Sequence, residues 1–231
     1  MESNDLNLNT NRRAFIGTLA TGAAAMTIGG LTAPLQTLAK ENDFPRDDDP
    51  DAWFNKIKGK HRIVFDVTEP RGVFPFAWPR IFLVTNTMTG TPEKESNVVV
   101  VLRHDAIPYA MNDSLWTKYN FGEMFKIEDG MTKAKATRNA FWKPKQGDFK
   151  VPGIGEVAIG INELQDSGVM FCCCNMALTV YSAMAAQSMN MKPEDVYKEW
   201  KAGVLPGIQI VPSGVWALGR AQEHGCGYIA V

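Results

Sequence analysis

Short apolar runs alternate along the chain with longer segments whose apolar residues recur at helical spacing. Residues 61–67 (HRIVFDV) and 97–103 (NVVVVLR) are rich in β-branched side chains, which predicts strands. The second run is almost continuously apolar, as is typical of a strand buried on both faces of a parallel sheet. Three later runs predict further strands: 168–174, 207–214 and 226–231.

Helical periodicity occupies the stretches between these runs. Between the first two runs, apolar residues recur at helical spacing at Phe76, Ile81, Phe82, Val84 and Met88. Four more segments predict helices: 157–167, 175–189, 192–203 and 215–225. Strands that alternate with helices predict an α/β fold. We expect a mainly parallel five-stranded sheet with helices on both faces and right-handed crossovers.

Two segments interrupt this alternation. Residues 128–155 are rich in Gly, Pro, Lys and aromatics and are too long for an ordinary connection, so we expect a lid or a partner surface there. Residues 40–60 are charged and turn-rich, which indicates an N-terminal arm with a short helix near 53–57. The domain itself is predicted to span 61–231.

The first 39 residues predict a twin-arginine export signal. Arg12 and Arg13 precede a mildly apolar stretch rich in Gly, Ala and Thr, at 14–33, and small residues precede a cut after Ala39. The stretch is too weakly apolar for a convincing membrane span. An uncleaved N-terminal anchor is the alternative. We therefore expect a periplasmic protein of about 190 residues, with no membrane span after cleavage and with one full core.

Composition narrows the class of function. The chain is 45% hydrophobic and 21% charged with a formal net charge of −1, as in ordinary soluble globular proteins. The near-zero charge gives no support for nucleic-acid binding. Five lysines are interpreted as a solvated loop surface: Lys133, Lys135, Lys143, Lys145 and Lys150. Nucleotide-binding motifs of the GxGxxG or GxxxxGK[ST] kind are absent from the sequence.

Three predicted strands end in residues that can carry chemistry. Cys172–Cys174 end the third strand, His104 and Asp105 follow the second, and 212–214 (Pro-Ser-Gly) follow the fourth. In an open parallel sheet, ligands bind beyond the carboxyl ends of the strands. We therefore expect these residues to gather at one edge.

Cys174 is the best candidate nucleophile. It stands at the start of a predicted helix, where free backbone N–H groups and the helix dipole favour a thiolate. His104 is a candidate acceptor for its proton, and it is equally well interpreted as a residue whose ring caps the next turn. Because side chains alternate along a strand, Cys172 and Cys174 are predicted on one face and Cys173 on the other.

The other cysteines have simpler interpretations. Cys172 and Cys226 are interpreted as small core hydrophobes, whereas Cys173 stays open between core and function. A strained vicinal disulfide between Cys173 and Cys174, or a pairing with Cys226, is an alternative.

A metal site is a further alternative, because thiols together with His104 and Met176 suit a soft ion such as Cu(I). Zinc and haem motifs such as CxxC, CxxCH and HExxH are absent, so no metal or other cofactor is predicted.

Ser213 and Gly214 precede a predicted helix, and their N–H groups suit an anion. Ser213 is equally well interpreted as a helix N-cap. Asn175, which follows the cysteines, is placed on the same ligand-facing edge.

Three stretches resemble the DsrE/DsrF-like sulfur-relay family: NVVVVLRHDAIPYAM, FCCCNMAL and LPGIQIVPSGVWALGRAQEHGCGYI. The resemblance covers about 62–111 and 168–231, and the C-terminal block is its more specific part. It implies a flavodoxin-like three-layer sandwich and a homo-oligomer, often a trimer or hexamer. It also implies a cysteine that carries sulfur as a persulfide, best matched by Cys174, with Cys173 as the near alternative.

The expected function is therefore sulfane-sulfur binding or transfer, by a possible sulfurtransferase or sulfur carrier with a donor or acceptor protein as partner. The alternative is a non-enzymatic protein that binds a soft metal, a small ligand or a partner. Export and the unusual triplet of cysteines are departures from the characterised family members, which are largely cytoplasmic.

Overall fold

The computed structural model describes residues 49–231. The predicted export signal and the first part of the N-terminal arm lie outside the described residues. The rest of the arm holds η1, a 3-10 helix over Pro50–Lys56, close to the short helix predicted there.

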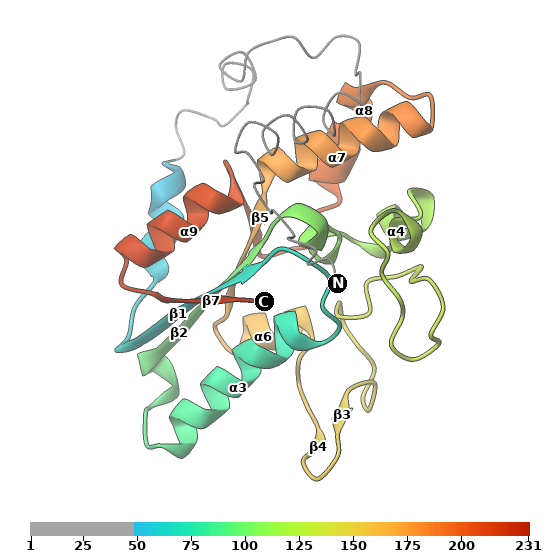
Figure 1. Ribbon diagram of the computed structural model, residues 1–231. Helices are drawn as coiled ribbons and strands as arrows, with labels where there is room; N and C mark the ends of the chain where they lie inside the picture. Colours follow the sequence, from blue (N-terminus) through green and yellow to red (C-terminus); the bar gives the residue numbers. More distant parts are fainter. Residues whose placement is uncertain (1–48) are drawn as a thin grey trace, which may run out of the picture. The chain divides into compact units, whose positions relative to one another are not determined.

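A parallel sheet of five strands forms the centre of the fold (Figure 1). Its strands are β1 (His61–Val67), β2 (Ser96–Leu102), β5 (Met170–Cys174), β6 (Ile208–Val211) and β7 (Gly227–Ala230). They lie in the order β6-β5-β2-β1-β7, and every neighbouring pair is parallel. The predicted three-layer α/β sandwich is confirmed.

Numbered along the chain, the strands of this sheet lie in the order 4-3-2-1-5, whereas flavodoxin itself has the order 2-1-3-4-5. The layers are those of a flavodoxin-like sandwich, and the reversal of direction falls at β1 and β7.

All five predicted helices are present among the described residues. They are α3 (Phe74–Met88), α6 (Ile161–Asp166), α7 (Asn175–Ser188), α8 (Pro193–Ala202) and α9 (Gly214–Glu223). The segment after β2 adds the 3-10 helix η3 (His104–Ala110), α4 (Asp113–Lys118) and α5 (Phe121–Met124). A short 3-10 helix, η2 (Glu93–Glu95), precedes β2, and the insert contains a two-stranded hairpin of β3 (Lys150–Val151) and β4 (Gly155–Glu156).

Helix α6 begins later than the predicted 157–167. Gly160 is its N-cap, and its N–H donates to the Glu163 carboxylate at 2.7 Å. This closes the helix start at Ile161, so the residues before it are irregular.

The direction in which the chain crosses the sheet decides which helices cover which face. From β1 to β2, β5 and β6 the chain steps one way, so right-handed crossovers put α3, α6, α7 and α8 on one face. From β6 to β7 it returns the other way, so α9 covers the opposite face together with η1 (Figure 1).

Two apolar clusters follow from this arrangement. The larger one contains the aromatic residues Phe76, Trp116, Phe171 and Trp200, all almost fully buried. The smaller one joins β1, β2 and β5 to η1 and α9, with Phe54 at its centre. Every described helix is too short or too polar to cross a membrane.

Helix α3 packs through a narrower face than its apolar pattern suggests. Phe76, Pro79 and Leu83 are buried, whereas Ile81 and Met88 are exposed. The spacing of apolar residues correctly predicts the helix, but it does not show which of its faces meets the sheet.

Candidate functional site

The carboxyl ends of β2, β5 and β6 bring the predicted residues to one edge. In the register of the sheet, Leu102 pairs with Cys173, and Cys174 pairs with Val211. The segments after β2 and β6, which begin at Arg103 and Pro212, therefore leave the sheet on the two sides of Cys174. The gathering of these segments at one edge, expected from the sequence, is present.

Cys174 is both the last residue of β5 and the N-cap of α7. Its Sγ accepts a hydrogen bond from the Ala177 N–H at 3.3 Å. A sulfur atom in this position faces the free N–H groups and the positive end of the helix dipole. The residue is 7% exposed, whereas Cys172 and Cys173 are 0% exposed.

The triplet does not follow strict strand alternation. Cys172 packs in the cluster on the α9 side of the sheet. Cys173 and Cys174 both belong to the cluster on the other face. Alternation predicts Cys172 and Cys174 together, but the chain turns into α7 at Cys174, and its sulfur bends back towards that helix.

Burial makes the other thiols poor nucleophiles. Desolvation raises the pKa of Cys172 and of Cys173 well above the ordinary value, and the charge of Cys174 adds to both shifts. Cys226 lies in the α9-side cluster, as expected, and burial raises its pKa to about 11. All four cysteines are free thiols, so no disulfide joins them.

Arg103 places a positive charge near Cys174. Its guanidinium binds the Asp66 carboxylate through two hydrogen bonds, of 2.6 and 2.9 Å, and the Tyr228 hydroxyl donates to the same carboxylate at 2.8 Å. The hydrogen bond to Asp66 raises the pKa of Arg103, and the charges of Asp66, Tyr228 and Cys174 add to this shift. Because Leu102 pairs with Cys173, Arg103 and Cys174 stand at the same level at the ends of neighbouring strands.

His104 begins η3 with a positive φ of 51°, a conformation that few non-glycine residues adopt. Its Nδ1 lies 3.2 Å from the Asp105 carboxylate, and its side chain is 62% exposed. Tyr181 on α7 donates a hydrogen bond to the same carboxylate, and its ring meets the His104 ring edge-on. Asp105 thus orients the imidazole from one side and ties it to α7.

His104 and Cys174 lie on the same edge of the sheet without a direct hydrogen bond. Among the described residues, the Cys174 sulfur accepts its hydrogen bond from the Ala177 N–H, and the His104 ring pairs with the Asp105 carboxylate. Helix η3, which begins at His104, packs against both β5 and α7, the two elements that meet at Cys174.

The remaining predicted residues have structural partners. Asn175 is buried and accepts a hydrogen bond from the Tyr197 hydroxyl at 2.7 Å, so its side chain faces α8. Ser213 is the N-cap of α9 and accepts from the Trp216 N–H at 3.1 Å. A Cβ atom at Gly214 would lie 2.6 Å from the Arg103 Cβ, so only glycine lets α9 start this close to Arg103.

The alternative of a soft-metal site gains no geometric support. Across residues 49–231, no group of three or more His, Cys, Asp or Glu side chains is placed to hold a metal ion.

Sequence reasoning missed Arg103, Asp66 and Tyr228 as parts of this edge. The sequence does contain a signal for this group, because Asp66 is the one charged residue among the otherwise apolar residues 63–67. A carboxylate that is buried in such a strand requires a partner. The partner comes from a neighbouring strand that is distant in sequence, so only the strand order identifies it.

No protein-family model matches this chain, and no curated protein matches it. Among solved structures, it is similar to the protein of unknown function MTH1491 from Methanobacterium thermoautotrophicum. The identity is 20%, 74% of this chain and 99% of that chain are covered, and the TM-score is 0.34. A similarity at this level assigns no activity.

Proposed function

We propose that this protein binds and passes on sulfane sulfur, with the Cys174 thiol as the carrier. The observation that carries the proposal is the difference within the triplet. Cys174 alone retains exposure and a helix N-terminal N–H donor, whereas burial keeps its two neighbours protonated. The position on the carboxyl edge of a parallel sheet is where ligands bind such folds.

The transfer step is a thiol–persulfide exchange. The Cys174 thiolate attacks the outer sulfur of a donor R–S–SH and forms a new S–S bond. The S–S bond of the donor breaks, and its electron pair leaves on the thiolate R–S⁻. Cys174 is then a persulfide, Cys174–S–SH, and both atoms and charge balance without an outside oxidant.

The surroundings of Cys174 suit this step. The Ala177 N–H and the dipole of α7 stabilise negative charge on the attacking sulfur, and Arg103 adds a positive charge that Asp66 holds in place. The exposed imidazole of His104, oriented by Asp105, is available to exchange a proton with the donor or the acceptor.

The wider setting is part of the same proposal. A DsrE-like sulfur carrier in the periplasm, acting as a homo-oligomer with a donor or acceptor protein, fits the resemblance and the twin-arginine pattern. These points rest on the sequence, and the experiment below tests the chemistry independently of them.

The test is intact mass spectrometry of the reduced full chain after treatment with glutathione persulfide. We expect the wild type to gain one sulfur atom and to release it when a thiol acceptor is added. Cys174→Ser should gain none. The serine is a good N-cap, so it keeps the start of α7 while removing the thiol.

Cys226→Ala serves as the matched control, because it removes a thiol of the same 7% exposure from the far side of the sheet and should gain sulfur like the wild type. Equal sulfur uptake by Cys174→Ser and the wild type would remove Cys174 as the carrier. Circular dichroism of each variant checks that the fold is kept.

A further inference from the structure

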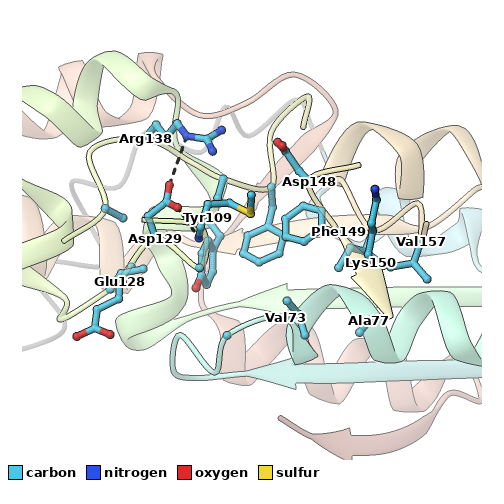
Figure 2. Close-up of a pocket in the computed structure, with 18 of the residues that line it drawn as sticks. Val73, Ala77, Tyr109, Glu128, Asp129, Arg138, Asp148, Phe149, Lys150 and Val157 are labelled. Carbon is cyan, nitrogen blue, oxygen red and sulfur yellow. Dashed lines mark hydrogen bonds and ion pairs between the residues drawn. The ribbon is translucent and has the colours of Figure 1, made fainter. Parts of the chain in front are cut away.

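The insert encloses a cavity of about 410 Å³ between its own loops, η3 and the start of α3 (Figure 2). This volume is in the range of small-molecule sites. Its walls come from residues around the start of α3 (Gly72, Val73 and Ala77), from Tyr109 on η3, from Trp116 on α4, and from the insert with its flanking residues, within 127–141 and 148–159. The cavity is separate from the residues that surround Cys174.

Aromatic and aliphatic side chains make up most of the walls. Phe141 and Phe149 stack with ring centroids 4.9 Å apart and planes 4° from parallel. Trp116, Ile127, Ala136, Val157 and Ile159 line the same cavity. Such walls suit a flat, mainly apolar ligand.

Tyr109 contributes a hydroxyl group to these apolar walls. The residue is only 2% exposed, and its ring is held edge-on by Phe76 and Phe141. Within the described part of the chain, its hydroxyl makes no hydrogen bond to another residue, and it is not among the fully buried polar atoms that lack a partner. A hydroxyl in such a wall takes its partner from the cavity, either water or a ligand.

The Tyr109 hydroxyl is equipped to donate. Burial raises the pKa of Tyr109 above its ordinary value, so the group keeps its proton at neutral pH. The matching ligand atom is therefore an acceptor, such as a carbonyl oxygen.

Charges around the cavity balance, so they do not select an ion. Asp129 is already engaged by the N–H groups of Met131 and Thr132, at 2.8 and 3.2 Å, and by Arg138 at 3.4 Å (Figure 2). The charged lining residues number three anions and three cations: Glu128, Asp129, Asp148, Lys133, Arg138 and Lys150. An uncharged ligand fits this environment best.

We propose that this cavity binds an uncharged aromatic molecule that carries a carbonyl-type acceptor, with the Tyr109 hydroxyl as the donor that orients it. The inference goes beyond sulfur transfer and does not depend on it. It gives the insert a role as the wall of a binding site, in keeping with the lid or partner surface expected for it.

The test uses a matched pair of ligands, 2-acetylnaphthalene and 2-ethylnaphthalene, whose main difference is the carbonyl oxygen. Binding to the full chain is measured by fluorescence titration. We expect the wild type to bind the ketone about five-fold more tightly than the hydrocarbon, as one hydrogen bond to a neutral group provides.

Three variants decide between the explanations. Tyr109→Phe removes only the hydroxyl, so it should abolish the five-fold preference and leave binding of the hydrocarbon and thermal unfolding unchanged. Ala77→Trp fills the cavity from α3, so it should abolish binding of both ligands. Cys174→Ser should bind both like the wild type, which separates this proposal from the sulfur carrier.

Failure of the wild type to bind either ligand would overturn the proposal. A preference for the ketone that persists in Tyr109→Phe would overturn the role of the hydroxyl. Equal binding of both ligands by the wild type would also overturn it, since that outcome means that water satisfies Tyr109.

Discussion

Asp66 shows how a single buried charge organises the edge of the sheet. Its carboxylate is 3% exposed and would be costly to bury alone. Arg103 binds it through two hydrogen bonds and Tyr228 through one. Tyr228 lies on β7, and Arg103 directly follows β2, so these partners come from the two sides of β1. The same contacts hold Arg103 in position at the edge of the sheet where Cys174 ends β5.

Removal of Arg103 should therefore destabilise the protein strongly. Arg103→Ala leaves the Asp66 carboxylate buried without its cation, and we expect the free energy of unfolding to fall by about 3 kcal/mol. Urea denaturation measures this change. The double variant Asp66→Asn with Arg103→Met leaves no unpaired charge and should recover much of the loss. A double variant less stable than Arg103→Ala would contradict this account.

At the scale of elements, β5 and α7 form the unit that separates the three cysteines. The strand holds Cys172 and Cys173 inside opposite clusters, and the strand-to-helix turn brings Cys174 to the helix start. The unit thus contains two thiols that are costly to ionise and one at the N-terminus of a helix.

Buried thiols give the fold a dependence on alkaline pH. Burial raises the pKa of Cys226 to about 11 from an ordinary value of 9.0, so the folded state keeps a proton that the unfolded state loses. The contribution of this thiol to stability is complete below about pH 9. It is lost as the pH rises to about 11. Cys172 and Cys173 shift in the same direction.

We expect the free energy of unfolding of the wild type to fall between about pH 9 and 11. In Cys226→Ala the unfolding free energy should fall less steeply with pH, by up to about 1.4 kcal/mol per pH unit, because one proton fewer is released on unfolding. Urea denaturation at several pH values measures the slopes, which separates this effect from the constant cost of the lost side chain. Identical slopes would show that the thiol ionises equally in both states.

At the scale of the whole molecule, the described part of the fold has an exposed apolar face on α3. Helix α3 exposes five large apolar side chains: Phe74, Trp78, Ile81, Val84 and Met88. Phe74 and Trp78 stack on each other, which keeps part of this surface flat. The homo-oligomer expected from the family resemblance stays a prediction, and this face of α3 supports it, because such surfaces commonly meet a second copy.

Charged substitutions on this face of α3 should therefore change the oligomeric state. We expect the wild type to elute as an oligomer in size-exclusion chromatography with light scattering. The double variant Trp78→Glu and Ile81→Glu should shift it to the monomer. Val215→Glu, at an exposed position on α9, is the matched control and should leave the mass unchanged. A monomeric wild type, or an oligomeric double variant, would exclude this face as the interface.

The fold was largely predictable because its signals are local. The apolar runs and the helical spacing depend on neighbouring residues, so the five strands and five helices are found close to their predicted bounds. Cys174 at the strand–helix junction was predictable for the same reason. The pocket around Tyr109 was not, because α3, η3 and the insert contribute to it from distant parts of the chain.

The sequence by itself therefore determined the alternation of elements, the three-layer class and the edge at which Cys174, His104 and Ser213 meet. The tertiary structure alone decided that Cys174 bends away from the face of Cys172, and that Arg103 joins Asp66. It also decided that the Tyr109 hydroxyl lies in the wall of a cavity. The physical reason is that periodicity is a property of one segment, whereas burial and pairing depend on which segments the strand order places side by side.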